Sequence, residues 1–340
     1  MASIKDVARV AGVSVSTVSH VINKTRFVSD SATQAVEKAI ASLGYKPSYL
    51  ARALKSKQTR TIGMLVTSST NPFFAEVVSG VEEGCYRNGY SLILGNSGNL
   101  PGRQLSYLHT LVHKQIDALV IMTTNRDTDF QAELDKQISC PRVVLDSEPI
   151  LNGCAIGDNS FVGGQLAAQH FLSLGHTKIG CLAGPNYHSR SNERFNGFQA
   201  ALHSAGLEID AKWVISGELT AKSGYLSAKK LLSYEARPTA IFAFNDLMAS
   251  GAYRAVHEAG LSIPYDISII GYDDIEIASF LVPALTTVQQ PGFELGLQAA
   301  ELLINNLEIG TELPPQVRRT PQLIARDSTA KPVTITTSRN

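Results

Sequence analysis

From Thr61 onward, short apolar runs alternate with amphipathic stretches, and this alternation restricts the fold more than any other feature of the sequence. Strands that alternate with helices indicate βαβ units and parallel sheets. A body of residues 61–340 is too long for one sheet of ordinary size, so we predict an α/β fold with two doubly wound sheets. The predicted strands are residues 61–67, 90–95, 116–122, 142–146, 178–184, 239–244, 267–273 and 285–290. The predicted helices are residues 73–88, 104–114, 161–174, 194–205, 223–233, 246–259 and 293–307.

Polar and aromatic side chains follow the predicted strands directly. Ligands of doubly wound folds bind beyond the carboxyl ends of the strands, so these side chains are the candidate ligand-binding residues. Carboxylate, amide and guanidinium groups bridge neighbouring hydroxyls, and aromatic rings cover the C–H face of a sugar. Such residues are also typical caps and turns, and Asn245 and Asp246 could simply cap the helix that follows them. The candidates are Asn71, Phe73, Phe74, Asp146, Arg194, Asn245, Asp273 and Gln290.

The charge of the chain is divided unevenly along its length. Residues 1–60 hold ten Lys and Arg against three Asp and Glu, a net charge of +7, whereas the whole chain is neutral. The remaining residues therefore carry −7. A small basic head on an acidic body is typical of a protein whose head meets a polyanion, although a solvated charged surface is the plainer alternative.

Residues 1–46 show the pattern of a helix-turn-helix DNA-binding domain, with helices predicted at about 3–11, 15–23 and 31–43. Gly12 makes the turn, and Ser14 is suited to cap the second helix. The outer face of that helix carries small hydrogen-bonding side chains, which allow a helix to enter the major groove and read base edges. A three-helix protein-interaction module is the alternative. The predicted DNA-binding residues of this segment are Ser14, Ser16, Thr17, His20, Asn23 and Arg26.

Residues 47–60 form a basic linker with one short helical pattern. A helix of this length is marginal alone in water, so we expect it to order as a hinge helix only on DNA. Leu54 would then insert between base pairs in the minor groove. A plain charged linker is the alternative.

Several other classes of protein find little support in the sequence. The N-terminus has no apolar secretory region, no apolar run is long enough to span a membrane, and four scattered cysteines are typical of reduced core residues, so we expect a cytoplasmic protein. No nucleophile-elbow, dinucleotide-binding or Walker motif is present, and His109 and His113 lack a third metal ligand nearby. We therefore predict neither enzymatic activity, nor a cofactor, nor a metal.

The segments IKDVA, VSVSTVSHVIN, PSYLARALK, GHTKIG, NDLMASGA, IIGYDDI and PALTTVQQP together resemble the lactose/galactose repressor family over nearly the whole chain. The resemblance implies a homodimeric repressor on a near-palindromic operator. It places Ser16, Thr17 and His20 in the major groove, and Tyr45, Leu54 and Lys55 at the hinge. It also implies a body like a periplasmic binding protein, with one subdomain of about residues 61–160 and 291–322 and another of about 161–290 and 323–340.

Within the family, the likeness is greatest to members that respond to ribose and next to those that respond to purines. The expected effector is therefore a small sugar, D-ribose, that binds the candidate residues above and acts as inducer. A purine base acting as corepressor is the alternative within the same family. Some relatives also bind a phosphocarrier protein, so such a partner is included among the expectations.

Overall fold

The computed structural model describes residues 2–45, 58–68, 70–98, 100–122, 128–146 and 153–333. The chain divides into two compact units, Met1–Thr59 and Arg60–Asn340, called here the head and the body. The predicted hinge helix, with Leu54 and Lys55, lies outside the described residues. No helix among the described residues is long and apolar enough to cross a membrane.

The head contains the three predicted helices, α1 (Ile4–Ala11), α2 (Val15–Asn23) and α3 (Asp30–Leu43). Ser3 and Asp6 form a capping box at the start of α1, and Gly12 ends that helix in the left-handed conformation. The buried side chains of Val7, Val18 and Val36 form the centre of a small core. The helix-turn-helix prediction is therefore confirmed at the level of the fold.

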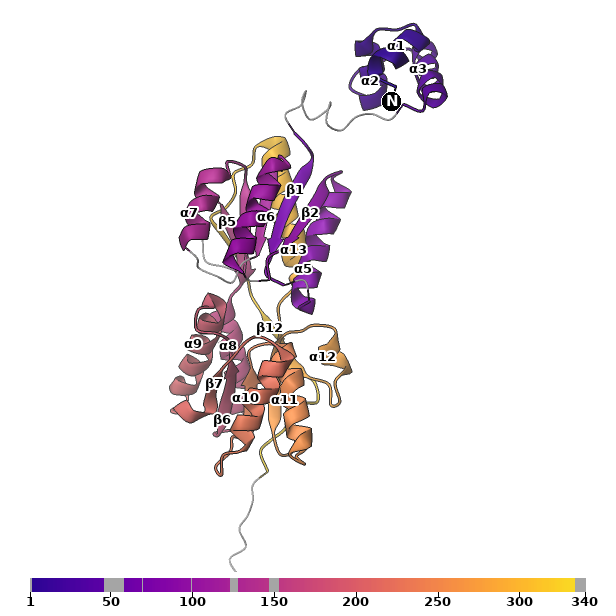
Figure 1. Cartoon of the computed structure of the whole chain (residues 1–340). Helices are drawn as coiled ribbons and strands as arrows, with labels where there is room; N and C mark the ends of the chain where they lie inside the picture. The colour runs from indigo at the N-terminus through magenta and orange to yellow at the C-terminus, as the bar shows by residue number, and fades with distance from the viewer. Residues whose placement is uncertain are drawn as a thin grey trace, which may run out of the picture. The chain divides into compact units, whose positions relative to one another are not determined.

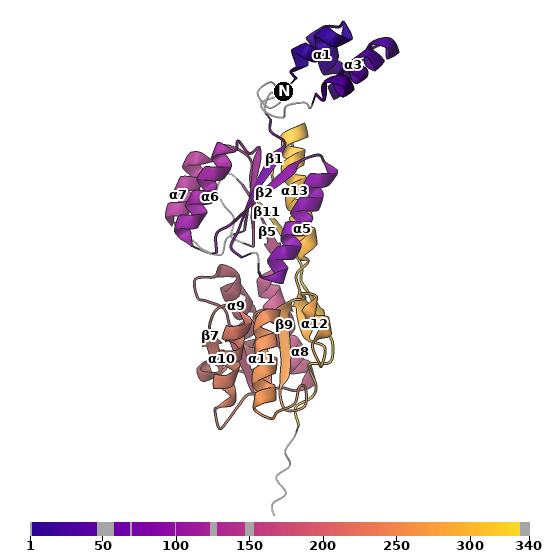
Figure 2. The same cartoon turned by 45° about the vertical axis from the view of Figure 1, so that its right-hand side comes forward.

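The first sheet of the body has six strands in the order β11-β5-β4-β3-β1-β2, and all neighbouring pairs are parallel. Helices α5 and α13 pack on one face and α6 and α7 on the other (Figure 1, Figure 2). We call this part the first subdomain. Its strands are β1 (Thr61–Val66), β2 (Ser91–Asn96), β3 (Ala118–Met122), β4 (Arg142–Leu145), β5 (Cys154–Asp158) and β11 (Gln316–Arg319), and its helices are α5 (Pro72–Arg87), α6 (Pro101–His113), α7 (Thr128–Gln137) and α13 (Gly292–Ile309).

The second sheet has the order β12-β10-β9-β8-β6-β7, and only the β10–β12 pair is antiparallel. Helices α8 and α9 pack on one face, and α10 and α11 on the other (Figure 1). We call this part the second subdomain. Its strands are β6 (Ile179–Ala183), β7 (Val214–Ser216), β8 (Ala240–Ala243), β9 (Ser268–Asp273), β10 (Thr286–Gln289) and β12 (Gln322–Ile324), and its helices are α8 (Ser160–Leu174), α9 (Ser189–Ser204), α10 (Ala221–Leu232), α11 (Asp246–Glu258) and the short α12 (Ile277–Phe280).

All eight predicted strands are present, and the doubly wound prediction is confirmed. Four further strands, β5, β7, β11 and β12, were not predicted; β7 and β12 have only three residues, and β11 (QVRR) is mostly polar. The prediction that Arg194 opens a helix is wrong: α9 begins at Ser189, capped by the side chain of His188. The earlier start gives the site an additional arginine, Arg190.

Candidate functional site

The outer face of α2 carries the predicted base-reading residues in the head. Ser14 accepts a hydrogen bond from the Thr17 backbone N–H at 3.1 Å, so its hydroxyl caps the helix. Ser16 is exposed, whereas the ring of His20 is half-buried with Nδ1 2.8 Å from the Thr25 hydroxyl. These hydrogen bonds hold the side chains of Ser14 and His20 in place, whereas the side chain of Ser16 stays accessible from solvent.

Three other predicted DNA-binding residues of the head differ in their surroundings. Asn23 donates from its amide to the Ser19 carbonyl at 2.8 Å, one turn earlier in α2. Arg26 is exposed in the loop that follows α2. Tyr45 is half-buried and packs against the head core. Among these three residues, Arg26 is the one whose side chain is presented to solvent.

We call the eight predicted ligand-binding residues the body site. The first subdomain contributes two aromatic rings and one carboxylate to this site. Asn71 caps α5 by accepting from the Phe73 N–H at 3.0 Å. This cap fixes the start of α5, where Phe73 and Phe74 are buried with ring centroids 5.8 Å apart. Asp146 follows β4 directly, with a left-handed φ of 52°. Such a backbone conformation is uncommon for a residue with a side chain and often marks a functional position.

The second subdomain contributes the polar remainder of the site. Arg194 lies in α9 with its guanidinium 3.3 Å from the ring centroid of Tyr272, and it donates to the Phe244 carbonyl. Asp273 ends β9 at a φ of 108° and accepts from the Gln290 amide at 2.7 Å. The structure therefore brings Arg194, Asp273 and Gln290 to the carboxyl ends of their strands or the adjoining helix, where ligands of doubly wound folds bind.

Asn245 and its neighbour Asp246 mainly support the structure. Asn245 caps α11 by accepting from the Met248 N–H at 2.8 Å, and its amide donates to the Leu219 carbonyl at 3.2 Å. Asp246 is fully buried and accepts from the Thr287 hydroxyl at 2.6 Å and the Ile275 N–H at 2.9 Å. The capping alternative raised by the sequence is therefore observed for Asn245, whose amide is held in place at the site.

Burial dominates the electrostatics of the body site. Burial raises the pKa of Asp146 to about 6, although Arg190 opposes the shift. Burial also raises the pKa of Asp273 well above its ordinary value, with Arg194 again opposing. Burial alone would lower the pKa of Arg194, but Tyr272 and the nearby carboxylates outweigh it and raise that pKa. Burial therefore favours the neutral form of both carboxyls, and the neighbouring guanidinium groups oppose that shift.

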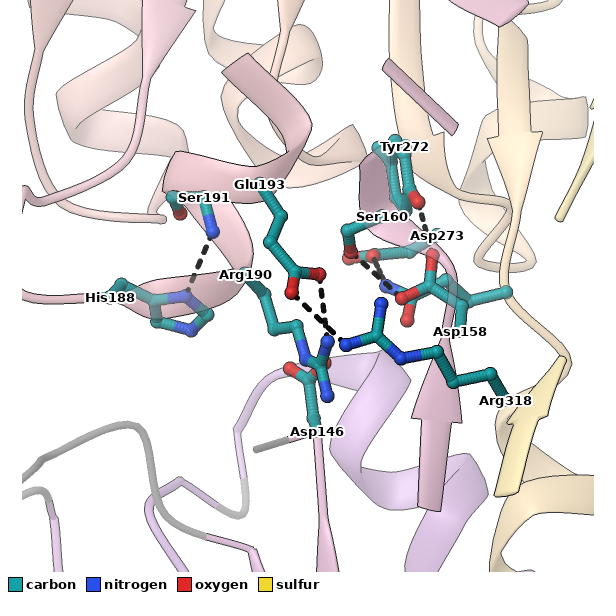
Figure 3. Close-up of polar contacts among 11 residues, drawn as sticks. Asp146, Asp158, Ser160, His188, Arg190, Ser191, Glu193, Tyr272, Asp273 and Arg318 are labelled. Carbon is teal, nitrogen blue, oxygen red and sulfur yellow. Dashed lines mark hydrogen bonds and ion pairs between the residues drawn. The ribbon is translucent and has the colours of Figure 1, made fainter. Parts of the chain in front are cut away.

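Several residues of the site were missed by the sequence reasoning (Figure 3). Arg190 lies one turn before Arg194 in α9, and its Nε is 3.7 Å from Oδ1 of Asp146. An i,i+4 spacing places two helix residues on one face, so Arg190 could have been found from the sequence once α9 was started correctly. Burial, together with Arg194 and Arg190, lowers the pKa of His188 to about 4, so its ring is neutral at pH 7. Nδ1 of that ring accepts from the Ser191 N–H at 3.2 Å, which leaves the proton on Nε2.

Four buried polar atoms of this region have no hydrogen-bond partner among the described residues: Asp146 Oδ1, Ser191 Oγ, Arg194 Nε and Gln290 Oε1. Buried polar groups in native proteins are nearly always satisfied. Three of the four belong to residues that the sequence predicted as ligand-binding. Their chemistry fits a ligand that both donates and accepts hydrogen bonds. No group of His, Cys, Asp and Glu in the described part of the chain is suited to hold a metal ion.

Comparison with known proteins identifies the family. Residues 3–48 match the model described as bacterial regulatory proteins, lacI family, and residues 168–329 match a periplasmic binding protein-like domain. The chain is 45% identical over 329 residues to the ribose operon repressor of Escherichia coli strain K12, covering 96% of this chain and 100% of that one. It is 44% identical over 332 residues to the HTH-type transcriptional repressor PurR of Vibrio vulnificus, covering 97% and 99%.

Solved structures agree with this assignment. The lac repressor dimer bound to operator and the anti-inducer ONPF is 30% identical, with a TM-score of 0.87 and coverage of 97% of this chain and 99% of that one. A lacI family transcriptional regulator from Enterococcus faecium with bound ribose is 36% identical, with a TM-score of 0.72 and coverage of 80% and 99%. The chain therefore belongs to the lacI family of bacterial regulatory proteins and is a transcriptional repressor with a helix-turn-helix head and a periplasmic-binding-protein-like body, not an enzyme.

Proposed function

We propose that the chain represses transcription as a cytoplasmic homodimer on a near-palindromic operator and that D-ribose, bound at the body site, releases it. The observation that carries the proposal is the set of buried atoms without a hydrogen-bond partner among the described residues, on Asp146, Arg194 and Gln290. A carboxylate and an amide oxygen accept from sugar hydroxyls, and a guanidinium donates to them. Phe73 and Phe74 supply buried apolar surface from the first subdomain, as sugar recognition requires.

The proposed residue roles follow the sequence predictions. Ser16, Thr17 and His20 read base edges in the major groove, Arg26 contacts phosphate or guanine, and the basic segment 47–60 acts as the hinge. In the minor groove, the hinge of one protomer would require the hinge of the other protomer beside it. A change in the dimer interface on effector binding would separate the two hinges and lower operator affinity. A hundredfold release corresponds to about 2.7 kcal/mol of differential effector binding between the two states.

Exposed apolar side chains support the homodimer. Phe280 and Val282, around the end of α12, are 69% and 91% exposed in the single chain. Large exposed apolar groups that lie close together mark interaction surfaces. The similar lac repressor was solved as a dimer on operator, which makes a second copy of this chain the partner that we propose for this surface.

A purine base acting as corepressor is the second candidate, favoured by the 44% identity to PurR of Vibrio vulnificus. Isothermal titration calorimetry of the full chain with D-ribose and, separately, with hypoxanthine distinguishes the two. Under our proposal D-ribose binds and hypoxanthine gives no binding heat. If hypoxanthine binds and makes operator binding tighter, the protein is a repressor with a purine corepressor, and the proposal of a sugar inducer is wrong.

A further inference from the structure

Four charged side chains form a continuous chain of ion pairs across the boundary between the two subdomains (Figure 3). Arg190 Nε lies 3.7 Å from Asp146 Oδ1, and Arg190 Nη1 donates to Glu193 Oε2 at 2.8 Å. Arg318 Nη2 donates to the other oxygen, Oε1, of Glu193 at 3.3 Å. Arg190 and Glu193 belong to α9 of the second subdomain, whereas Asp146 and Arg318 belong to the first. The ion-pair chain therefore joins the subdomains at two points.

The surroundings of this ion-pair chain strengthen it compared with ordinary surface pairs. The Arg190 side chain is 0% exposed and that of Asp146 is 11% exposed, while Glu193 and Arg318 are 22% and 33% exposed. Exposed pairs contribute little because water screens them, whereas breaking a buried pair leaves a charge in a poorly solvated place. Glu193 binds a different nitrogen of the Arg190 guanidinium, Nη1, from the one that lies beside Asp146, Nε.

We propose that this ion-pair chain, called here the latch, holds the two subdomains together and in doing so assembles the body site. Arg318 holds Glu193, Glu193 holds Arg190, and Arg190 positions Asp146. Arg190 and Glu193 are positioning residues, and the inference rests on the proposed function in taking Asp146 as an effector residue. If only molecules with the latch formed bind effector well, the apparent affinity equals the intrinsic affinity multiplied by the fraction of molecules in which the latch is formed. Variants that break the latch therefore lower the apparent affinity.

The test uses the Glu193–Arg318 link, because Arg318 is not one of the predicted ligand-binding residues. Full-length Glu193→Gln, Arg318→Gln and the double variant are titrated with D-ribose by calorimetry. We expect each single variant to bind about fivefold more weakly, which is within the usual range of coupling between sites. The double variant should be no weaker than the worse single one, because both changes break the same link. Additive losses, or no loss, would overturn the latch.

Arg319→Gln is the matched control. Arg319 is the next residue on β11, but its guanidinium donates to Gln298 at 2.9 Å, within the first subdomain. Its replacement removes the same charge without touching the boundary, so D-ribose affinity should be unchanged. A loss equal to that of Arg318→Gln would show that net charge, not the latch, is responsible.

A second readout does not depend on the effector. Spin labels at Lys114→Cys and Lys230→Cys, both exposed and one in each subdomain, report the distance between the subdomains. The latched protein should give one narrow distance distribution, and Arg318→Gln should broaden it or add a second distance. If the protein binds no D-ribose, the proposed effector fails but this distance still decides the latch. Identical distributions, with only a lower melting temperature, would reduce the ion-pair chain to a structural role.

Discussion

The head and the body present their functional side chains in opposite ways. In the head, Ser16 and Arg26 are exposed and the contacts around them are local to α2 and its turns. In the body, Arg194, Asp273 and Gln290 are almost fully buried and are held by partners far away in the sequence. A surface that reads DNA must remain open, whereas a site for a small polar molecule must exclude water and hold its polar groups in advance.

The acidic side chains show the same difference. In the head, the backbone N–H and hydroxyl of Ser3 donate to Asp6 and lower the pKa of that carboxyl at the surface. In the body, burial raises the pKa values of Asp146 and Asp246. Changes in the body should therefore affect stability and pH response together, whereas changes at the exposed head residues Ser16 and Arg26 should affect DNA binding with little effect on the fold.

The largest effect is expected for Arg194→Ala. The change removes a buried cation beside Asp273 and leaves the Phe244 carbonyl without its donor. Losing one partner of a buried pair costs about 3–5 kcal/mol, so the effector response should disappear and the body should be less stable. Calorimetry with D-ribose and urea unfolding measure the two effects. The exposed helix pair Arg254–Glu258 provides a control, Arg254→Ala, which should change neither by much.

A pH titration of stability should give the next largest effect. Burial raises the pKa of Asp246 to about 7 from an ordinary value of 3.8. The native state therefore binds this proton more tightly than the unfolded chain, so the stabilisation is present below pH 4 and is lost as pH rises through 7. The loss amounts to at most about 4 kcal/mol. Asp246→Asn should flatten this decline in urea unfolding measured from pH 4 to 8; an unchanged slope would assign the decline to another group.

Ser16→Ala should act on DNA binding alone. The hydroxyl is exposed, and under the proposed function its loss removes one base contact, so we expect operator affinity to fall about tenfold, near 1.4 kcal/mol. D-ribose affinity and the melting temperature should stay the same. A fall in effector affinity would contradict the separation of roles between head and body.

The smallest effect is expected for Ser14→Ala, which removes the cap of α2. Loss of such a cap costs about 1 kcal/mol of helix stability. The head should melt earlier while the body is unaffected, as observed by circular dichroism of the full chain. A loss confined to operator affinity, with no change in head stability, would mean that Ser14 contacts DNA and is not mainly a cap.

Prediction from sequence succeeded where local signals agree with the fold. Helix-capping residues and glycines correctly predicted the three helices of the head, and apolar runs correctly predicted eight strands of the body. It failed at α9, where the capping side chain is His188, a residue outside the usual caps, so Arg190 was overlooked. The latch also could not be predicted, because Glu193 and Arg318 are 125 residues apart and no local pattern joins them. Asp146, Asp273 and Gln290 lie at or directly after the ends of strands, whereas Arg194 lies within α9 and the two phenylalanines lie in α5. The partners of these side chains depend on tertiary packing, which no local pattern shows.

The most direct measurement is a titration of a labelled near-palindromic operator with the full chain, followed by fluorescence anisotropy, with and without D-ribose. We expect tight binding at low ionic strength, which D-ribose weakens about a hundredfold. In Arg194→Ala, operator binding should be insensitive to the sugar. Operator binding that stays the same at saturating D-ribose, while calorimetry shows the sugar bound, would contradict this expectation.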